Sequence, residues 1–149
     1  MLFRSGLDER ACADIGIRVY KVGMTWPLEP VGIRDFARGL QDILVVEEKH
    51  AFIESQMKEL FYNFEGINSD GHRPSIVGKY DESGEWILPS TNELTPARIA
   101  RVIARRLQPF HQSEQIEQQL RFLASKEAEL ALPRANFFYS IQARNSICF

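Results

Sequence analysis

The sequence predicts an α/β domain with helices layered against a mostly parallel sheet, and three observations support this fold class. A strand, a loop, a helix and a second strand follow one another between residues 17 and 48, which is the order of a βαβ unit. The second strand is apolar at consecutive positions, as expected where both faces are covered. Strands and apolar-faced helices then alternate along a chain of 149 residues, which is long enough for one domain with a sizeable core.

The βαβ unit begins with a strand over Ile17–Val22, where β-branched residues favour a pleated, buried surface. Gly23 ends this strand, and Pro27 then holds the loop in an extended or turn geometry. The following helix is expected over Pro30–Leu40, since a proline suits the first helical turn. Its buried face contains Ile33, Phe36, Ala37 and Leu40. A short helix over Leu7–Ile15 precedes the unit.

The second strand contains the apolar run Ile43–Val46, and a pair of acidic residues, Glu47 and Glu48, follows it directly. A helix with an apolar stripe is expected over Ala51–Tyr62. Residues 63–74 are rich in turn formers and are expected to form a loop.

The second half of the chain continues this alternation. A third strand is expected over Ser75–Tyr80, and Glu85–Leu88 could return as a short hairpin strand. Thr95 and Pro96 mark the start of the next helix, as N-cap and first helical residue. A long polar helix is then expected over Ser113–Leu132.

Pro133 is expected to end this long helix, and we divide the chain there. Residues 1–132 form the α/β domain. Residues 133–149 form an apolar tail without a clear period, which needs a surface to cover, in this domain or in a neighbour.

Composition excludes several classes of protein. A net charge of −2 argues against a nucleic-acid binder, and the longest apolar run is far too short to span a membrane. The N-terminus has neither the apolar region nor the cleavage site of a signal peptide. Cys12 and Cys148 lie at opposite ends of the chain, so they suggest neither a disulfide framework nor a metal site. We expect a cytoplasmic protein with two unpaired thiols.

The sequence contains none of the short motifs that mark common nucleotide-binding, hydrolase or metal sites. His50, His72 and His111 lie far apart in different segments, so they are not expected to form a metal site. No residue is therefore predicted to be catalytic or to bind a metal.

The best candidates for a functional role lie at the carboxyl edge of the predicted sheet. Glu47 and Glu48 could face a cleft or an adjoining domain there, or they could cap the following helix. Trp26 could be a packing anchor or a contact for a partner. Lys79 could bind an anion, although a lone lysine at a strand end is usually solvated. Four arginines are most simply the polar face of a helix: Arg98, Arg101, Arg105 and Arg106.

An ordered series of segments resembles the indolepyruvate ferredoxin oxidoreductases and spans roughly residues 13 to 132. In chain order, the segments are Ile17–Pro30, Phe36–Leu40, Leu44–Lys49, Arg73–Pro74, Val77–Glu82, Leu88–Pro89 and Glu93–Ala97.

The resemblance implies a specific fold and reaction. The family is thiamine-diphosphate-dependent and oxidatively decarboxylates arylpyruvates to acyl-CoA, with electrons passing through an iron–sulfur cluster to ferredoxin. The matching region is a middle domain similar to the transketolase C-terminal domain, a three-layer α/β/α fold with a mostly parallel sheet. This domain is mainly a scaffold and a contact surface. The activating glutamate and the Mg-binding motif lie in the two thiamine-binding domains on either side of it.

The chain departs from this family pattern in two places. The resemblance places an earlier strand of the middle domain ahead of the matching segments, so we expect one edge or central strand of the sheet to be missing from this chain. In the tail, Tyr139, Gln142 and Arg144 stand where the family has the cysteines and the histidine of a Cys-x-Gly-Cys-Pro-His segment.

These departures predict a fragment that is inactive alone, binds no cofactor by itself and works with other domains or subunits of the oxidoreductase. Thiamine diphosphate, Mg, the iron–sulfur cluster and CoA belong to the full enzyme. The alternative is a non-catalytic interaction module that binds its partner through Trp26 and Glu47. Because an uncovered strand edge and an apolar tail attract partners, we also expect self-association.

Overall fold

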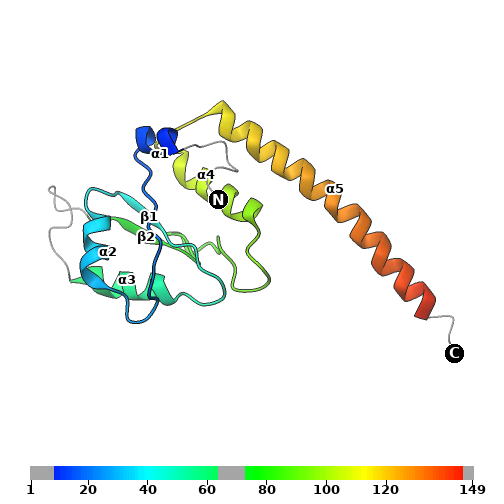
Figure 1. The fold of residues 1–149 in the computed structure, drawn as a ribbon, viewed down its shortest axis with the longest axis horizontal. Helices are drawn as coiled ribbons and strands as arrows, with labels where there is room; N and C mark the ends of the chain where they lie inside the picture. The colour runs from blue at the N-terminus through cyan, green and yellow to red at the C-terminus, as the bar shows by residue number, and fades with distance from the viewer. Residues whose placement is uncertain (1–8, 64–72, 146–149) are drawn as a thin grey trace.

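The computed structural model describes residues 9–63 and 73–145, and it contains helices packed around a small parallel sheet (Figure 1). The elements in chain order are α1 (Glu9–Ile15), α2 (Pro30–Ala37), β1 (Asp42–Leu44), α3 (Phe52–Tyr62), β2 (Ser75–Val77), α4 (Pro96–Leu107) and α5 (Glu114–Asn145). The arrangement agrees with the predicted α/β class, and the five helices expected from the sequence are all present.

The sheet consists of β1 and β2, which pair in parallel with Asp42 opposite Ser75 and Leu44 opposite Val77. The strand predicted over Ile17–Val22 is wrong, because these residues form no strand in the structure. Val19 in this segment is 72% exposed. β-branched residues favour a strand only where a neighbouring strand pairs with it, and this segment has no such neighbour among the described residues.

The third predicted strand is shorter than expected, because β2 ends at Val77. The return strand is reduced to one antiparallel bridge between Tyr80 and Trp86, whose rings stack at 6.4 Å. Asp81 shapes the turn between them, since its Oδ1 atom accepts hydrogen bonds from the N–H groups of Ser83 and Glu85, each at 2.9 Å.

Helices lie on both sides of this sheet (Figure 1). On one side, α2 and α3 bury Ile33, Met57 and Phe61 against Ile43 and Val45 of the β1 region. On the other side, α4 packs through an apolar cluster whose members are Leu44, Ile87, Leu88, Leu94, Ile99, Val102 and Ile103. The start of α4 agrees with the sequence, since the Thr95 hydroxyl accepts a hydrogen bond from the N–H of Arg98 at 3.3 Å.

The last helix, α5, runs on to Asn145, so the prediction that Pro133 ends it is wrong. A proline removes one hydrogen bond within a helix, and strong helix formers before and after it in the sequence can tolerate that loss. Most of the tail that showed no clear period is therefore helical, while residues 146–149 lie outside the described part of the chain. Near its start, α5 packs Ile116 against Cys12 of α1, and Figure 1 shows its far end projecting away from the other helices.

Candidate partner-contact site

The carboxyl ends of β1 and β2 meet the first turns of α3, and the sequence candidates lie around this edge. Glu47 places both carboxylate oxygens at the start of α3, where they accept hydrogen bonds from the N–H groups of Ile53 at 2.9 Å and Glu54 at 3.1 Å. Ala51, the N-cap residue, provides no side-chain hydrogen bond, so Glu47 satisfies these helix donors from upstream. Of the two alternatives for Glu47, the structure shows the capping role. Glu48 is exposed.

The loop that carries Trp26 is fixed to α3 by one side chain, Gln56. Its amide nitrogen donates to the carbonyl oxygen of Thr25 at 2.8 Å, and its Oε1 atom accepts from the N–H of Leu28 at 2.8 Å. Leu28 is buried in the core, whereas Trp26 between these two anchors is 72% exposed. Trp26 is therefore not a packing anchor within the described residues. The loop displays a large aromatic ring from a fixed backbone.

A second exposed aromatic residue lies on the helix that holds this loop. Phe52 opens α3, is 60% exposed and contacts the ring of His50 edge-on, at 5.8 Å between centroids. The amide nitrogen of Gln56 also donates to the carbonyl oxygen of Phe52, at 2.9 Å. One glutamine thus contacts the backbone of both the Trp26 loop and the first turn of α3. Sequence reasoning missed Gln56, because nothing distinguishes it from other polar residues on this helix.

Lys79 is buried, with 3% of its surface exposed, so the expectation of a solvated lysine is wrong. Its ammonium group donates to the backbone carbonyl of Glu47, and its own N–H donates to Oε2 of Glu54 at 2.9 Å. Glu54 is itself 4% exposed, and its other oxygen pairs with Lys58 at 2.6 Å. These bonds connect the ends of both strands to α3. Lys79 therefore stabilises the fold, and its buried ammonium group is not available to bind an anion.

The chemistry available at this edge is that of a contact surface. The two least exposed carboxylates, those of Glu47 and Glu54, are both engaged in hydrogen bonds within the fold. The part of the chain that the structure describes contains no group of three or more histidine, cysteine, aspartate or glutamate side chains that could hold a metal ion. What this edge presents to a partner is the aromatic surface of Trp26 and Phe52, with the Glu48 carboxylate in the connecting turn.

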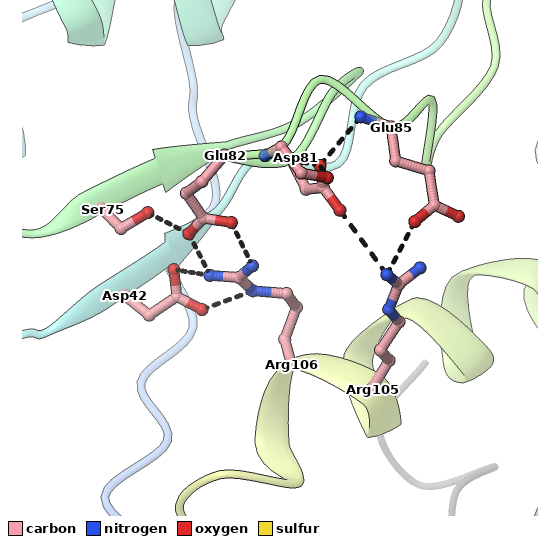
Figure 2. Close-up of polar contacts among 8 residues, drawn as sticks. Asp42, Ser75, Asp81, Glu82, Glu85, Arg105 and Arg106 are labelled. Atoms are coloured by element: carbon pink, nitrogen blue, oxygen red, sulfur yellow. Dashed lines mark hydrogen bonds and ion pairs between the residues drawn. The ribbon is translucent and has the colours of Figure 1, made fainter.

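A second polar cluster, which the sequence did not predict, lies at the amino ends of the two strands (Figure 2). Arg106 of α4 binds the carboxylate of Asp42 through Nε and one terminal nitrogen, at 2.8 and 2.7 Å. It also binds Glu82 through both terminal nitrogens, each at 2.7 Å. The hydroxyl of Ser75 donates to Glu82 as well. The guanidinium of Arg106 therefore ties α4 to the first residue of β1 and to the turn after β2.

Arg105 extends this cluster by pairing with Glu85 at 2.7 Å and with Asp81 at 3.6 Å (Figure 2). The hydrogen bonds from Arg106 and Ser75 lower the pKa of Glu82 to about 2. The side-chain hydrogen bond from Ser83 lowers the pKa of Asp81. Arg105 is exposed, as predicted for the polar face of a helix, whereas Arg106 is only partly exposed, and both also bind carboxylates across the fold.

This cluster lines a hollow of about 550 Å³ together with Gln41, Ile87 and Phe110. The guanidinium of Arg106 faces two carboxylates and that of Arg105 faces two more, so both positive charges that line the hollow are already paired. The arrangement is that of a clamp between α4 and the sheet, and neither arginine offers an unpaired positive charge to an anionic ligand.

The histidines and cysteines are not brought together. His50 lies in the turn before α3 and His111 between α4 and α5, while His72 lies outside the described residues. Cys12 is buried, and Cys148 also lies outside the described residues. In the described part of the chain, no helix combines the length and the apolar character needed to cross a membrane.

Comparison with known proteins identifies one family. The family model described as the indolepyruvate ferredoxin oxidoreductase middle domain matches residues 1–132. Searches of curated proteins and of solved structures found no match. The matched region includes the whole carboxyl edge with Trp26 and Glu47. It also includes the clamp formed by Arg105 and Arg106, here called the arginine clamp, and α5 as far as residue 132.

Proposed function

The chain belongs to the family of indolepyruvate ferredoxin oxidoreductase middle domains, and from this premise we propose that it is a non-catalytic scaffold within such an enzyme. The complete enzyme would be thiamine-dependent and would oxidatively decarboxylate arylpyruvates to acyl-CoA. Thiamine diphosphate, Mg, the iron–sulfur cluster and CoA would be bound by other domains. The middle domain would adopt the three-layer, transketolase C-terminal-like arrangement when it is joined to them.

The observation that carries this proposal is the fixed, exposed Trp26 loop. Gln56 holds the backbone on both sides of Trp26, so the ring can be buried by a partner without the cost of ordering the loop. Aromatic residues are enriched where protein surfaces meet. The hydrogen bonds of Glu47 and Glu54 within the fold support a structural use of the acidic residues at this edge.

A test combines the purified chain with the remaining domains of an indolepyruvate ferredoxin oxidoreductase, expressed without their own middle domain. We expect co-elution in size-exclusion chromatography, and we expect Trp26→Ala to weaken the complex by about tenfold, as for an aromatic contact residue. Trp86→Ala is the matched control, since Trp86 is also exposed but lies in the turn next to the arginine clamp. Failure to co-elute, or equal effects of the two variants, would contradict the proposal.

Activity provides a second test. The isolated chain, supplied with thiamine diphosphate, Mg²⁺, CoA and indolepyruvate, is expected not to reduce an electron acceptor such as methyl viologen. The acceptor should be reduced when the remaining domains are added. Turnover by the isolated chain would show that it is an enzyme in its own right.

The exposure of both Trp26 and Phe52 also favours a second candidate, an independent interaction module on the same fold. A stoichiometric complex that depends on Trp26 but contains a protein unrelated to any oxidoreductase would support this alternative. Trp26→Ala measures the contact in either case, and the identity of the bound protein separates the two functions.

A further inference from the structure

The carboxyl edge of the sheet, where Trp26 and Phe52 are exposed, is acidic. It is formed by the loop at residues 23–29, the turn at residues 46–51, the first two turns of α3 at residues 52–59, and the loop at residues 89–94. Gln56 joins the first loop to α3, and Lys49 joins the turn to the last loop by donating to the carbonyl oxygen of Asn92 at 3.2 Å.

The charge of these four segments differs from that of the rest of the chain. Together they contain six glutamates and two lysines but no aspartate or arginine, which gives a formal charge of −4. The net charge of the whole chain is −2, so all the other residues together are positively charged. The excess of negative charge is therefore concentrated on the surface that also displays the exposed aromatic rings.

Three of the six glutamates are exposed and free to meet a partner: Glu48, Glu59 and Glu93. Among the described residues, none of these three side chains makes a hydrogen bond or an ion pair. The other three accept hydrogen bonds from backbone N–H groups of the fold: Glu29, Glu47 and Glu54. The edge thus separates carboxylates that stabilise the fold from carboxylates that face solvent.

The three free carboxylates are distributed around the exposed rings. Glu59 lies on α3 at a spacing of seven residues from Phe52, which places the two on the same face of the helix. Glu48 lies in the turn that leads from β1 to Phe52. Glu93 lies in the loop that Lys49 ties to this turn. An aromatic contact with a rim of negative charge results.

The two lysines of the edge do not neutralise this rim. Lys58 is paired with Glu54 at 2.6 Å, so its charge is matched by a carboxylate outside the free set. Lys49 remains, and when it is counted against the three free carboxylates, two negative charges are left.

We propose that the partner surface that covers Trp26 and Phe52 is basic, with an apolar socket for the indole ring and lysine or arginine side chains on its rim. This inference rests on the proposed function and names the chemistry of the partner at the same site. Charges around an interface are matched by opposite charges on the other side, where they steer the encounter and exclude wrong partners. The rings supply the contact, and the carboxylates select the partner.

Other occupants fit this edge less well. A nucleic acid or an anionic membrane would be repelled by the same carboxylates. A metal ion needs several ligands together, and the part of the chain that the structure describes holds no group of three or more histidine, cysteine, aspartate or glutamate side chains suited to this. A second copy related by two-fold symmetry would bring an equally acidic edge against this one. A basic protein surface is the occupant that the charges favour.

The test uses the remaining domains of an indolepyruvate ferredoxin oxidoreductase, expressed without their own middle domain and immobilised for biolayer interferometry. Association and dissociation rates of the chain are measured at about 50 mM and about 500 mM NaCl, because the higher concentration screens charges on a rim. Glu48→Lys, Glu59→Lys and Glu93→Lys should each lower the association rate constant by about threefold at low salt, and together by at least about tenfold. These differences should disappear at high salt.

Asp14→Lys is the matched control, because Asp14 is an exposed carboxylate on α1 and the variant changes the net charge by the same amount. It should associate at the rate of the unmodified chain. Glu48→Gln should have a smaller effect than Glu48→Lys in the same direction. Trp26→Ala should instead raise the dissociation rate, since the ring supplies contact rather than steering. Circular dichroism checks that each variant folds.

The outcomes separate this inference from the proposed function. If Trp26→Ala weakens the complex while the three lysine variants associate like Asp14→Lys, the proposed function stands and the basic partner surface is excluded. If the lysine variants associate faster than the unmodified chain, the partner surface is acidic and the inference is wrong. If the unmodified chain forms no complex, the proposed function fails and this inference fails with it.

Discussion

The position of the Glu54 carboxylate in α3 depends on the absence of a side chain at Gly78. Oε2 of Glu54 accepts the N–H of Lys79 at 2.9 Å, and a Cβ atom built on Gly78 would lie 2.4 Å from this same oxygen. The glycine therefore allows the carboxylate to reach the backbone just beyond β2. Because both Glu54 and Lys79 are buried, a displaced carboxylate would leave polar groups without partners.

Gly78→Ala is expected to lower the free energy of unfolding by about 1–3 kcal/mol, because the methyl group displaces a buried, hydrogen-bonded carboxylate. Gly23→Ala is the matched control, since nothing lies within 4 Å of a Cβ atom at that position. The control should be neutral or slightly stabilising. Urea denaturation of the two variants checks the difference, and equal midpoints would show that Glu54 moves at no cost.

Glu47 stabilises the whole of α3, because its two carboxylate oxygens accept hydrogen bonds from N–H groups in the first turn of this helix. Glu47→Ala should destabilise the protein by about 1 kcal/mol, the usual cost of losing a side-chain cap. Glu48→Ala provides the control, because it removes the neighbouring carboxylate, which is exposed. Thermal denaturation should place only the Glu47 variant at a lower midpoint. If Glu47→Ala also weakened the complex with the thiamine-binding domains beyond its effect on stability, Glu47 would have a contact role in addition to capping.

The arginine clamp joins α4 to the sheet and makes stability depend on pH. The pKa of Glu82 falls from 4.5 to about 2 in the folded chain, because Arg106 and Ser75 donate hydrogen bonds to its carboxylate. A lowered carboxyl pKa stabilises the fold above the unfolded value, and this stability is lost as the pH falls from 4.5 toward 2. Since the Glu82 side chain is 53% exposed, solvent screening limits the gain to about 1 kcal/mol.

Glu82→Gln should therefore lower the free energy of unfolding at pH 7 by up to about 1 kcal/mol, and the difference from the unmodified chain should shrink below pH 4.5. Glu93→Gln is the control, because Glu93 is an exposed carboxylate on the loop before α4. Urea denaturation at a series of pH values checks both variants. A difference that stays constant between pH 7 and pH 3 would contradict the account of the clamp.

At the scale of the whole molecule, the sequence predicted the helices well because their signals are local. Thr95 and Pro96 identify the start of α4, and the apolar spacing of α2 and α3 identifies their buried faces. The prediction of a strand over Ile17–Val22 was wrong, because strand formation depends on a partner that is distant in the sequence. Pro133 shows that a single breaking residue can be outweighed by the helix formers around it.

In the candidate site too, features that depend on neighbours in the sequence could be predicted, and features that depend on distant residues could not. The capping alternative for Glu47 follows from local sequence, because Glu47 lies just before the predicted helix. For Trp26 the sequence left a packing role and a contact role open, and the structure shows the side chain exposed. Gln56 and the burial of Lys79 did not follow, because their partners are 28 to 32 residues away. The arginine clamp joins residues 64 apart, a separation at which periodicity alone carries no information about partners.

The open side of β1 and the exposed aromatic residues predict self-association of the whole chain. Among the described residues, β1 pairs with β2 on one side only, so we expect the open β1 edges of two copies to pair in a weak dimer that forms as concentration rises. Sedimentation velocity should show this shift. Val46→Pro should remove most of the association, whereas Val46→Thr should retain it. Association that Val46→Pro does not reduce would locate the contact elsewhere, and Trp26→Ala would then test the aromatic surface. A monomer at all concentrations would show that the open edge alone does not bring two copies together.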